Sequence, residues 1–169
     1  MNRKLAMCAV LTALALIFSY VEVLLPLSAA LPGIKLGLAN IVILVALYTL
    51  GTGPALAVNV LRIFLSGLLF GNLFAIAYGL AGGLFSFLVM ALLKKTGRFS
   101  ITGVSMAGGV AHNAGQLVIA ALLVENAGVF LYLPVLLIAG MVSGILMGIV
   151  AYLIVKRLSG GAKSLRNES

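Results

Sequence analysis

The stretch Leu31–Asn40 reads LPGIKLGLAN and interrupts a chain that otherwise consists mostly of long apolar runs. Its Pro-Gly pair is a turn signal. Lys35 precedes the next apolar run, and Asn40 lies inside it. Membrane-spanning helices explain most of the remaining sequence, but they do not explain this stretch. We therefore expect it to form the edge of a binding site.

The composition of the chain predicts an integral membrane protein. The 169 residues are 63% hydrophobic and 8% charged, whereas soluble domains carry roughly 25% charged residues. No soluble fold buries so much apolar surface. A transmembrane β-barrel needs polar side chains at alternate positions, and the apolar runs lack this alternation. We therefore expect an all-α, multi-pass protein whose surroundings include membrane lipid.

The apolar runs predict six transmembrane helices, because a span takes about 20 apolar residues. Their approximate ranges are 5–25, 36–50, 55–70, 73–93, 104–124 and 131–155. The first run begins as a signal peptide would, but it is long and contains Glu22, so we expect it to be a retained span. The six spans form one transmembrane domain over residues 1–158. A polar tail, which we expect to be disordered, follows at 159–169.

The basic residues predict the orientation of the spans. Nine of the eleven Lys and Arg residues lie in three clusters outside the apolar runs. The clusters are Arg3 and Lys4; Lys94, Lys95 and Arg98; and Lys156, Arg157, Lys163 and Arg166. Basic loops are retained in the cytoplasm, so six spans place all three clusters and both termini there. We attribute the net charge of +8 to orientation and lipid headgroup contact, not to nucleic acid.

Polar side chains inside the apolar runs are the candidate site residues, because polar groups are costly in hydrocarbon. Arg62 is the strongest candidate, since it lies in the middle of a span and must face a cavity, a carboxylate or backbone carbonyls. The functional interpretation is contact with an anionic ligand. The structural interpretation is a pair with Glu22, the only acidic residue in the first four spans.

The other candidates within spans are amides and one imidazole: Asn40, Asn59, His112, Asn113 and Gln116. His112 and Gln116 share one face of the fifth span at a spacing of four. All five residues remain open to two interpretations, which are ligand contact and hydrogen bonding between helices.

The residue types that are scarce in the chain limit its chemistry. It has one Cys, one His and three acidic residues, all of them Glu. A metal site usually takes three or four protein ligands, and holding Mg²⁺ with a diphosphate normally takes several carboxylates. The P-loop pattern that binds nucleotides is missing. We expect no catalytic residue, no cofactor and no metal in this chain.

The run Pro32–Asn40, with Glu22, Pro26 and the His112-Asn113-x-x-Gln116 pattern, resembles a bacterial membrane protein family. The family is called heptaprenyl diphosphate synthase component I, or the Gx transporter family. It is similar in layout to the S components of energy-coupling factor (ECF) transporters, which are six-helix proteins with both termini in the cytoplasm. The resemblance implies a multi-pass protein of the bacterial cytoplasmic membrane.

The resemblance also implies a function. An S component is the substrate-binding subunit of an importer, and it captures a vitamin or related small molecule from outside under the loop between spans 1 and 2. The expected substrate-binding residues are Glu22, Lys35, Asn40, Asn59, Arg62, His112, Asn113 and Gln116. Lys35 and Arg62 favour an anionic or polar substrate by charge.

A partner is implied by the same resemblance. S components dock on a transmembrane coupling protein, which works with ATPase subunits, through an Ala-x-x-x-Ala face of span 1. Ala9 and Ala13 match this spacing, and Ala6 lies on the same face. Two alternatives stay open: a non-catalytic membrane component associated with heptaprenyl diphosphate synthesis, and a purely structural assembly factor.

Overall fold

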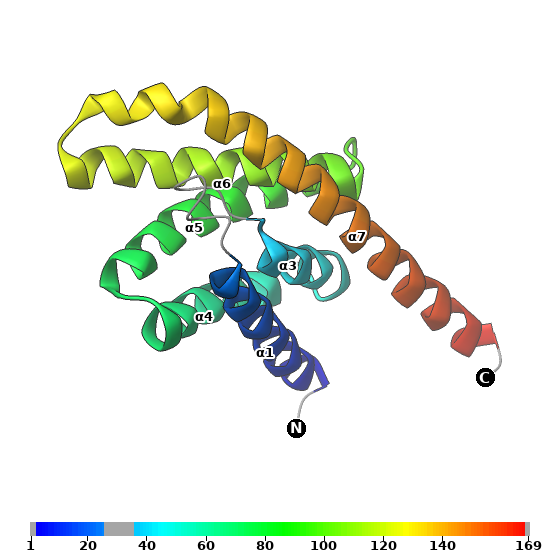
Figure 1. Cartoon of the computed structure of the whole chain (residues 1–169). Helices are drawn as coiled ribbons and strands as arrows, with labels where there is room; N and C mark the ends of the chain where they lie inside the picture. The colour runs from blue at the N-terminus through cyan, green and yellow to red at the C-terminus, as the bar shows by residue number, and fades with distance from the viewer. Residues whose placement is uncertain (1–2, 26–35, 168–169) are drawn as a thin grey trace.

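A computed structural model describes residues 3–25 and 36–167, and within them the chain forms helices and short turns without strands. In chain order the helices are α1 (Arg3–Leu24), α3 (Leu38–Thr49), α4 (Thr52–Phe70), α5 (Leu73–Thr96), α6 (Ile101–Val124), the short 3₁₀ helix η1 (Ala127–Tyr132) and α7 (Leu133–Asn167). Some neighbouring helices, such as α6 and α7, run antiparallel, and the helices together pack as one bundle (Figure 1). The predicted all-α class is confirmed.

Five of the described segments are long and apolar enough to cross a membrane. They are α1, α4, α5, α6 and the segment Ala127–Ser159, which includes η1 and most of α7. The second predicted span corresponds to α3, which has only 12 residues, whereas a full span takes about 20. A multi-pass membrane protein is therefore supported, while the count of six spans and their orientation stay predictions.

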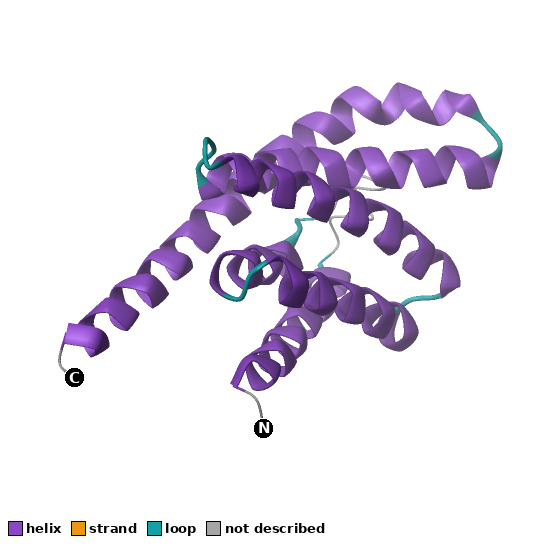
Figure 2. Cartoon of the chain, turned by 180° about the vertical axis from the view of Figure 1, so that it is seen from behind, coloured by secondary structure: helices purple, strands orange, loops and turns teal. Residues whose placement is uncertain are grey.

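The C-terminal helix is longer than the sequence predicts. We expected the last span to end near Val155 and the polar tail to be disordered. Instead, α7 continues to Asn167, and its C-terminal part extends away from the other helices (Figures 1 and 2). The prediction of disorder is therefore wrong up to this residue.

Helix α3 forms the centre of the bundle. Every residue from Ile41 to Leu47 is buried, and α1, α4 and α7 pack around the helix. A helix that is apolar on all sides is buried on all sides, which explains why this segment carries almost no polar residue. At its C-terminal end, Lys94 Nζ donates to the carbonyl oxygen of Leu47 and lies 5.0 Å from the ring centroid of Tyr48.

Small residues set the close packing of α6 against α7, which lie side by side (Figures 1 and 2). A Cβ atom added to Gly109 would lie 2.2 Å from the carbonyl oxygen of Gly140. One added to Gly144 would lie 2.7 Å from the Cα of Met106. Glycine therefore lets the two backbones touch, as small residues do between membrane helices.

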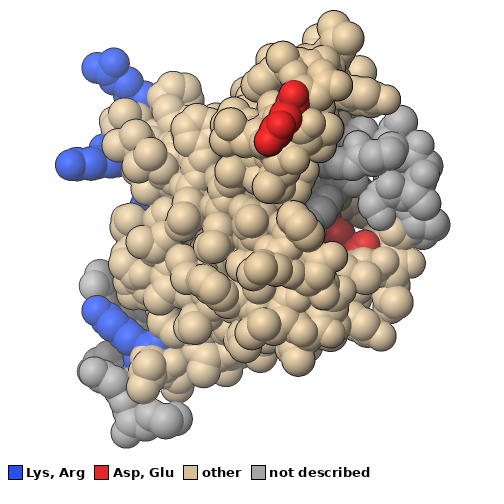
Figure 3. Space-filling view, turned by 90° about the vertical axis from the view of Figure 1, so that its left-hand side faces the viewer, with Lys and Arg blue, Asp and Glu red and all other residues tan. Residues whose placement is uncertain are grey.

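Charged side chains are separated on the surface. Figure 3 shows the basic side chains along one edge of the molecule, and the acidic side chains away from that edge. The three basic clusters lie at the start of α1, in the last turn of α5 with the turn that follows it, and in the second half of α7. The predicted orientation requires the Lys and Arg clusters to lie on one side of the bundle, and the orientation stays a prediction.

Candidate functional site

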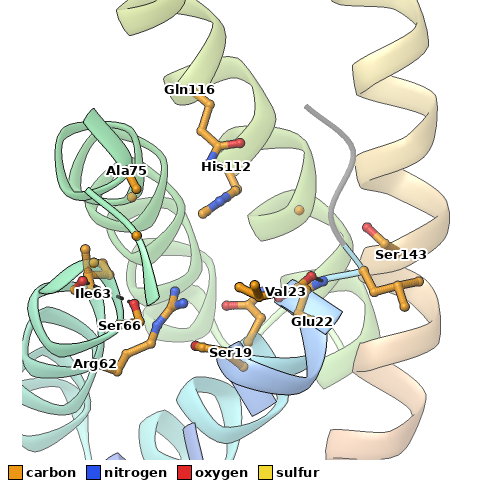
Figure 4. A pocket seen from close by; sticks show the side chains of 18 of the residues that line it. Ser19, Glu22, Val23, Arg62, Ile63, Ser66, Ala75, His112, Gln116 and Ser143 are labelled. Carbon is orange, nitrogen blue, oxygen red and sulfur yellow. Dashed lines mark hydrogen bonds between the residues drawn. The ribbon is translucent and has the colours of Figure 1, made fainter. Parts of the chain in front are cut away.

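A cavity of about 260 Å³ lies among α1, the start of α3, α4, α5, α6 and α7. Figure 4 shows Arg62 and Glu22 on opposite sides of it, with His112 and Gln116 further along the cavity. Its polar lining residues are Ser19, Glu22, Asn40, Arg62, Ser66, His112, Asn113, Gln116 and Ser143. The cavity thus gathers polar side chains from helices that are far apart in the sequence.

Arg62 is held in place by a buried amide one turn earlier on α4. Its Nε and Nη2 atoms donate to Asn59 Oδ1 at 3.3 and 3.2 Å. Asn59 is only 1% exposed, and its Nδ2 donates to the carbonyl oxygen of Gly83 in α5 at 3.1 Å. The amide therefore anchors the guanidinium to two helices and fixes its direction toward the cavity.

Glu22 connects the end of α1 to the start of α3. Its Oε1 atom accepts a hydrogen bond of 2.6 Å from the backbone N–H of Gly37. Gly37 precedes α3 and has a φ of 74°, a left-handed conformation that glycine adopts without strain. A carboxylate at a helix N-terminus is stabilised by the backbone dipoles. The acidic side of the cavity is therefore fixed by the backbone at the start of α3.

His112 and Gln116 lie on one face of α6, next to α5. A Cβ atom added to Gly82 would lie 2.7 Å from Gln116 Cγ and 3.1 Å from His112 Cε1. Glycine at this position of α5 therefore makes room for both polar side chains. Asn113 also lines the cavity, but its Nδ2 donates to the carbonyl oxygen of Leu136 in α7 at 2.6 Å. Asn113 therefore forms a hydrogen bond between helices, as Asn59 does with Gly83.

The structure brings six of the eight predicted binding residues together at the cavity: Glu22, Asn40, Arg62, His112, Asn113 and Gln116. Asn59 lies behind Arg62 instead of on the cavity wall. Lys35 falls outside the described residues. The roles of all eight in binding stay predictions.

Sequence reasoning missed three serines on the cavity wall: Ser19, Ser66 and Ser143. Ser66 and Ser143 donate to carbonyl oxygens three residues earlier on their own helices, as serine commonly does in helices, so their sequence context carries no signal. Ser19 differs. It is 9% exposed, and its buried Oγ has no hydrogen-bond partner among the described residues. Because Ser19 lies one helical turn before Glu22, the sequence could have identified it as a second polar residue on the same face of the helix.

Two other expectations concern a metal site and the docking face of α1. Among the described residues, no three His, Cys, Asp or Glu side chains gather where they could hold a metal ion. On α1, Ala9 and Ala13 are exposed and Ala6 is partly buried. The alanine face therefore points away from the chain's own helices at two of its three positions.

The chain was compared with curated proteins, with solved structures and with models of protein families. No curated protein matches it, and no solved structure does. The model of the family described as heptaprenyl diphosphate synthase component I matches residues 11–154, which include α1 from its middle, all of α3 to α6 and the part of α7 that lines the cavity. The chain therefore belongs to the heptaprenyl diphosphate synthase component I family.

Proposed function

We propose that the protein is the substrate-binding membrane subunit of a small-molecule importer of the ECF S-component type. One observation carries the proposal: an arginine, a glutamate and several amides converge on a single cavity inside an apolar bundle. Ionisable side chains within membrane segments are costly and commonly mark a ligand or ion pathway. In this proposal, the polar groups at the cavity bind the ligand.

The hydrogen bonds of the two charged residues favour a ligand over a structural ion pair. Arg62 donates to Asn59, and Glu22 accepts from Gly37. An arginine has five N–H donors, and two of those of Arg62 go to the amide. The rest are available at the cavity wall, where a polar substrate group can accept them.

A transport cycle needs access, a partner and energy. In the proposed cycle, the substrate is a vitamin-like or cofactor-precursor-like molecule that enters from outside under the loop containing Lys35. The exposed positions Ala9 and Ala13 dock on a transmembrane coupling protein, and ATPase subunits supply the energy. The chain itself is not an enzyme in this proposal, and it lies in the bacterial cytoplasmic membrane.

A second candidate function follows from the family's description. It is a non-catalytic membrane component associated with heptaprenyl diphosphate synthesis. With three glutamates and no aspartate, the chain is poorly equipped to hold Mg²⁺ and a diphosphate, which normally takes several carboxylates. Under this candidate function, another subunit carries the catalysis and this chain binds it or a polyprenyl chain.

Native mass spectrometry of the protein purified from its own membranes separates the two functions. The importer proposal predicts one water-soluble small molecule bound per chain, lost in Arg62→Gln and retained in Arg98→Gln, a matched change at an exposed arginine. A bound polyprenyl compound or a co-purified synthase subunit supports the second function. A chain that carries only bulk lipid contradicts the importer proposal.

The docking face needs its own test. Ala9→Trp and Ala13→Trp are expected to abolish co-purification with a coupling protein and to leave ligand binding intact. Loss of ligand binding in these variants would mean that the face packs within the chain. Two single variants, Lys35→Ala and Arg62→Ala, test whether the charged side chains bind the ligand. If both variants keep the wild-type ligand affinity, this role of the charges is wrong.

A further inference from the structure

We infer that the substrate of this cavity is a small amphiphilic zwitterion, which carries one anionic and one cationic group beside an apolar body. The inference rests on the proposed substrate-binding function and narrows it. It follows from the opposite charges of Glu22 and Arg62, from their separate hydrogen bonds and from the apolar part of the cavity wall.

Among the described lining residues, Glu22 is the one carboxylic acid and Arg62 is the one guanidinium. They belong to different helices, α1 and α4, and Figure 4 shows them on opposite sides of the cavity. Their charges sum to zero. A ligand with a single net charge would leave one charge in the cavity without a counterpart, and an uncompensated buried charge is strongly unfavourable.

Each charged side chain has hydrogen-bonding capacity left for a ligand. A carboxylate accepts at about four lone-pair positions, and Glu22 Oε1 accepts one bond from Gly37. The guanidinium of Arg62 uses two N–H groups on a single oxygen of Asn59. The glutamate can therefore accept from a ligand ammonium group, while the arginine can donate to a ligand carboxylate.

Ser19 supplies an independent sign that the cavity is built for a polar guest. Ser19 lines the cavity and is more than nine-tenths buried, and its buried Oγ has no partner among the described residues. A buried hydroxyl that is left unbonded is destabilising. The side chain lies one turn before Glu22, so a ligand ammonium group at the carboxylate can also donate to its Oγ.

The rest of the wall sets the body of the ligand. Side chains of Val23, Leu36, Ile63, Phe70 and Met147 line the cavity beside the polar groups. At about 30 Å³ per water molecule, the volume of 260 Å³ corresponds to roughly nine waters. An amino acid with a large apolar side chain has the matching size and distribution of polarity.

Thermal stability of the purified protein with three forms of one probe tests the inference. The probes are tryptophan, which is a zwitterion, N-acetyltryptophan, which is an anion, and tryptophan amide, which is a cation. The wild type is expected to bind tryptophan about tenfold or more tightly than either singly charged form, because each charged hydrogen-bonded contact is worth at least that factor.

Two charge-removing variants should change this preference in opposite ways. Glu22→Gln keeps an acceptor for Gly37 and removes the negative charge, so the anion should bind it as well as tryptophan does. Arg62→Gln should bind the cation as well as tryptophan. Glu125→Gln and Arg98→Gln remove the same charges at exposed positions outside the cavity and should keep the wild-type preference.

The possible results separate this inference from the proposed function. A singly charged probe that binds the wild type at least as tightly as tryptophan overturns the inference and leaves the function standing. If no probe binds, the molecule that mass spectrometry finds in the purified protein decides: a zwitterion supports the inference, and a compound with a net charge overturns it. A protein that binds no small molecule in either experiment overturns both.

Discussion

Asn59→Leu is the change that removes the support of Arg62 while leaving the cavity wall itself in place. Leucine is close to asparagine in size and neither donates nor accepts. The variant loses the bond to Gly83 O, worth about 0.5–1.5 kcal/mol, and the bonds from the guanidinium, worth about 1.5–3 kcal/mol. The sum is about 2–4.5 kcal/mol. Three bonds at the average of about 0.6 kcal/mol measured within membrane proteins give a lower bound near 2 kcal/mol.

The free energy of unfolding, measured by denaturant titration in mixed detergent micelles, provides the assay. Asn59→Asp is the matched variant: it loses the donor to Gly83 O but keeps acceptor oxygens for Arg62, so it should lose only about 1 kcal/mol. The reasoning is refuted if Asn59→Leu stays within about 0.5 kcal/mol of the wild type, the range of unimportant surface substitutions. It is also refuted if the Asp variant is as unstable as the Leu variant.

Three further changes test the packing and the helix ends. Gly109→Ala should lower the free energy of unfolding by about 1–3 kcal/mol or more, because its Cβ would lie 2.2 Å from Gly140 O; a melting temperature equal to the wild type would contradict the close α6–α7 contact. Lys94→Met should lower the free energy of unfolding by about 1–2 kcal/mol, because Leu47 O at the end of α3 loses its hydrogen-bond donor. A melting temperature in detergent equal to that of the wild type would show that this bond does not contribute to stability. Glu22→Ala should cost about 1–2 kcal/mol by leaving the first N–H before α3 without its acceptor, whereas Glu22→Gln should unfold at nearly the wild-type temperature; similar losses in the two variants would exclude this role.

The helical class and six of the nine polar cavity residues were accessible from the sequence. Apolar runs of about 20 residues have few solutions in a bilayer, so the long helices follow from composition. Arg62 stood out because a charge in the middle of a span needs a reason. Small residues let membrane helices approach closely, and Gly140 and Gly144 of α7 make such a contact with α6.

The short central helix and the direction of hydrogen bonds were not accessible. The run that begins at Leu36 is as apolar as a spanning helix, and nothing in it shows that three other helices cover it on all sides. Whether Arg62 meets Glu22 or Asn59 depends on how α1 and α4 are placed relative to each other. The spacing of three residues places Asn59 next to Arg62 on α4. It does not show that Asn59 is held in position by Gly83 of α5, and this bond is what orients the amide toward Arg62.

An experimental structure of the protein purified with its bound molecule tests the central claim most directly. We expect density for one small molecule in the cavity, with an anionic group within hydrogen-bond distance of Arg62 and a cationic group within that distance of Glu22. A ligand bound elsewhere on the bundle, or a cavity closed by its own side chains while the protein still binds its ligand, would contradict the account.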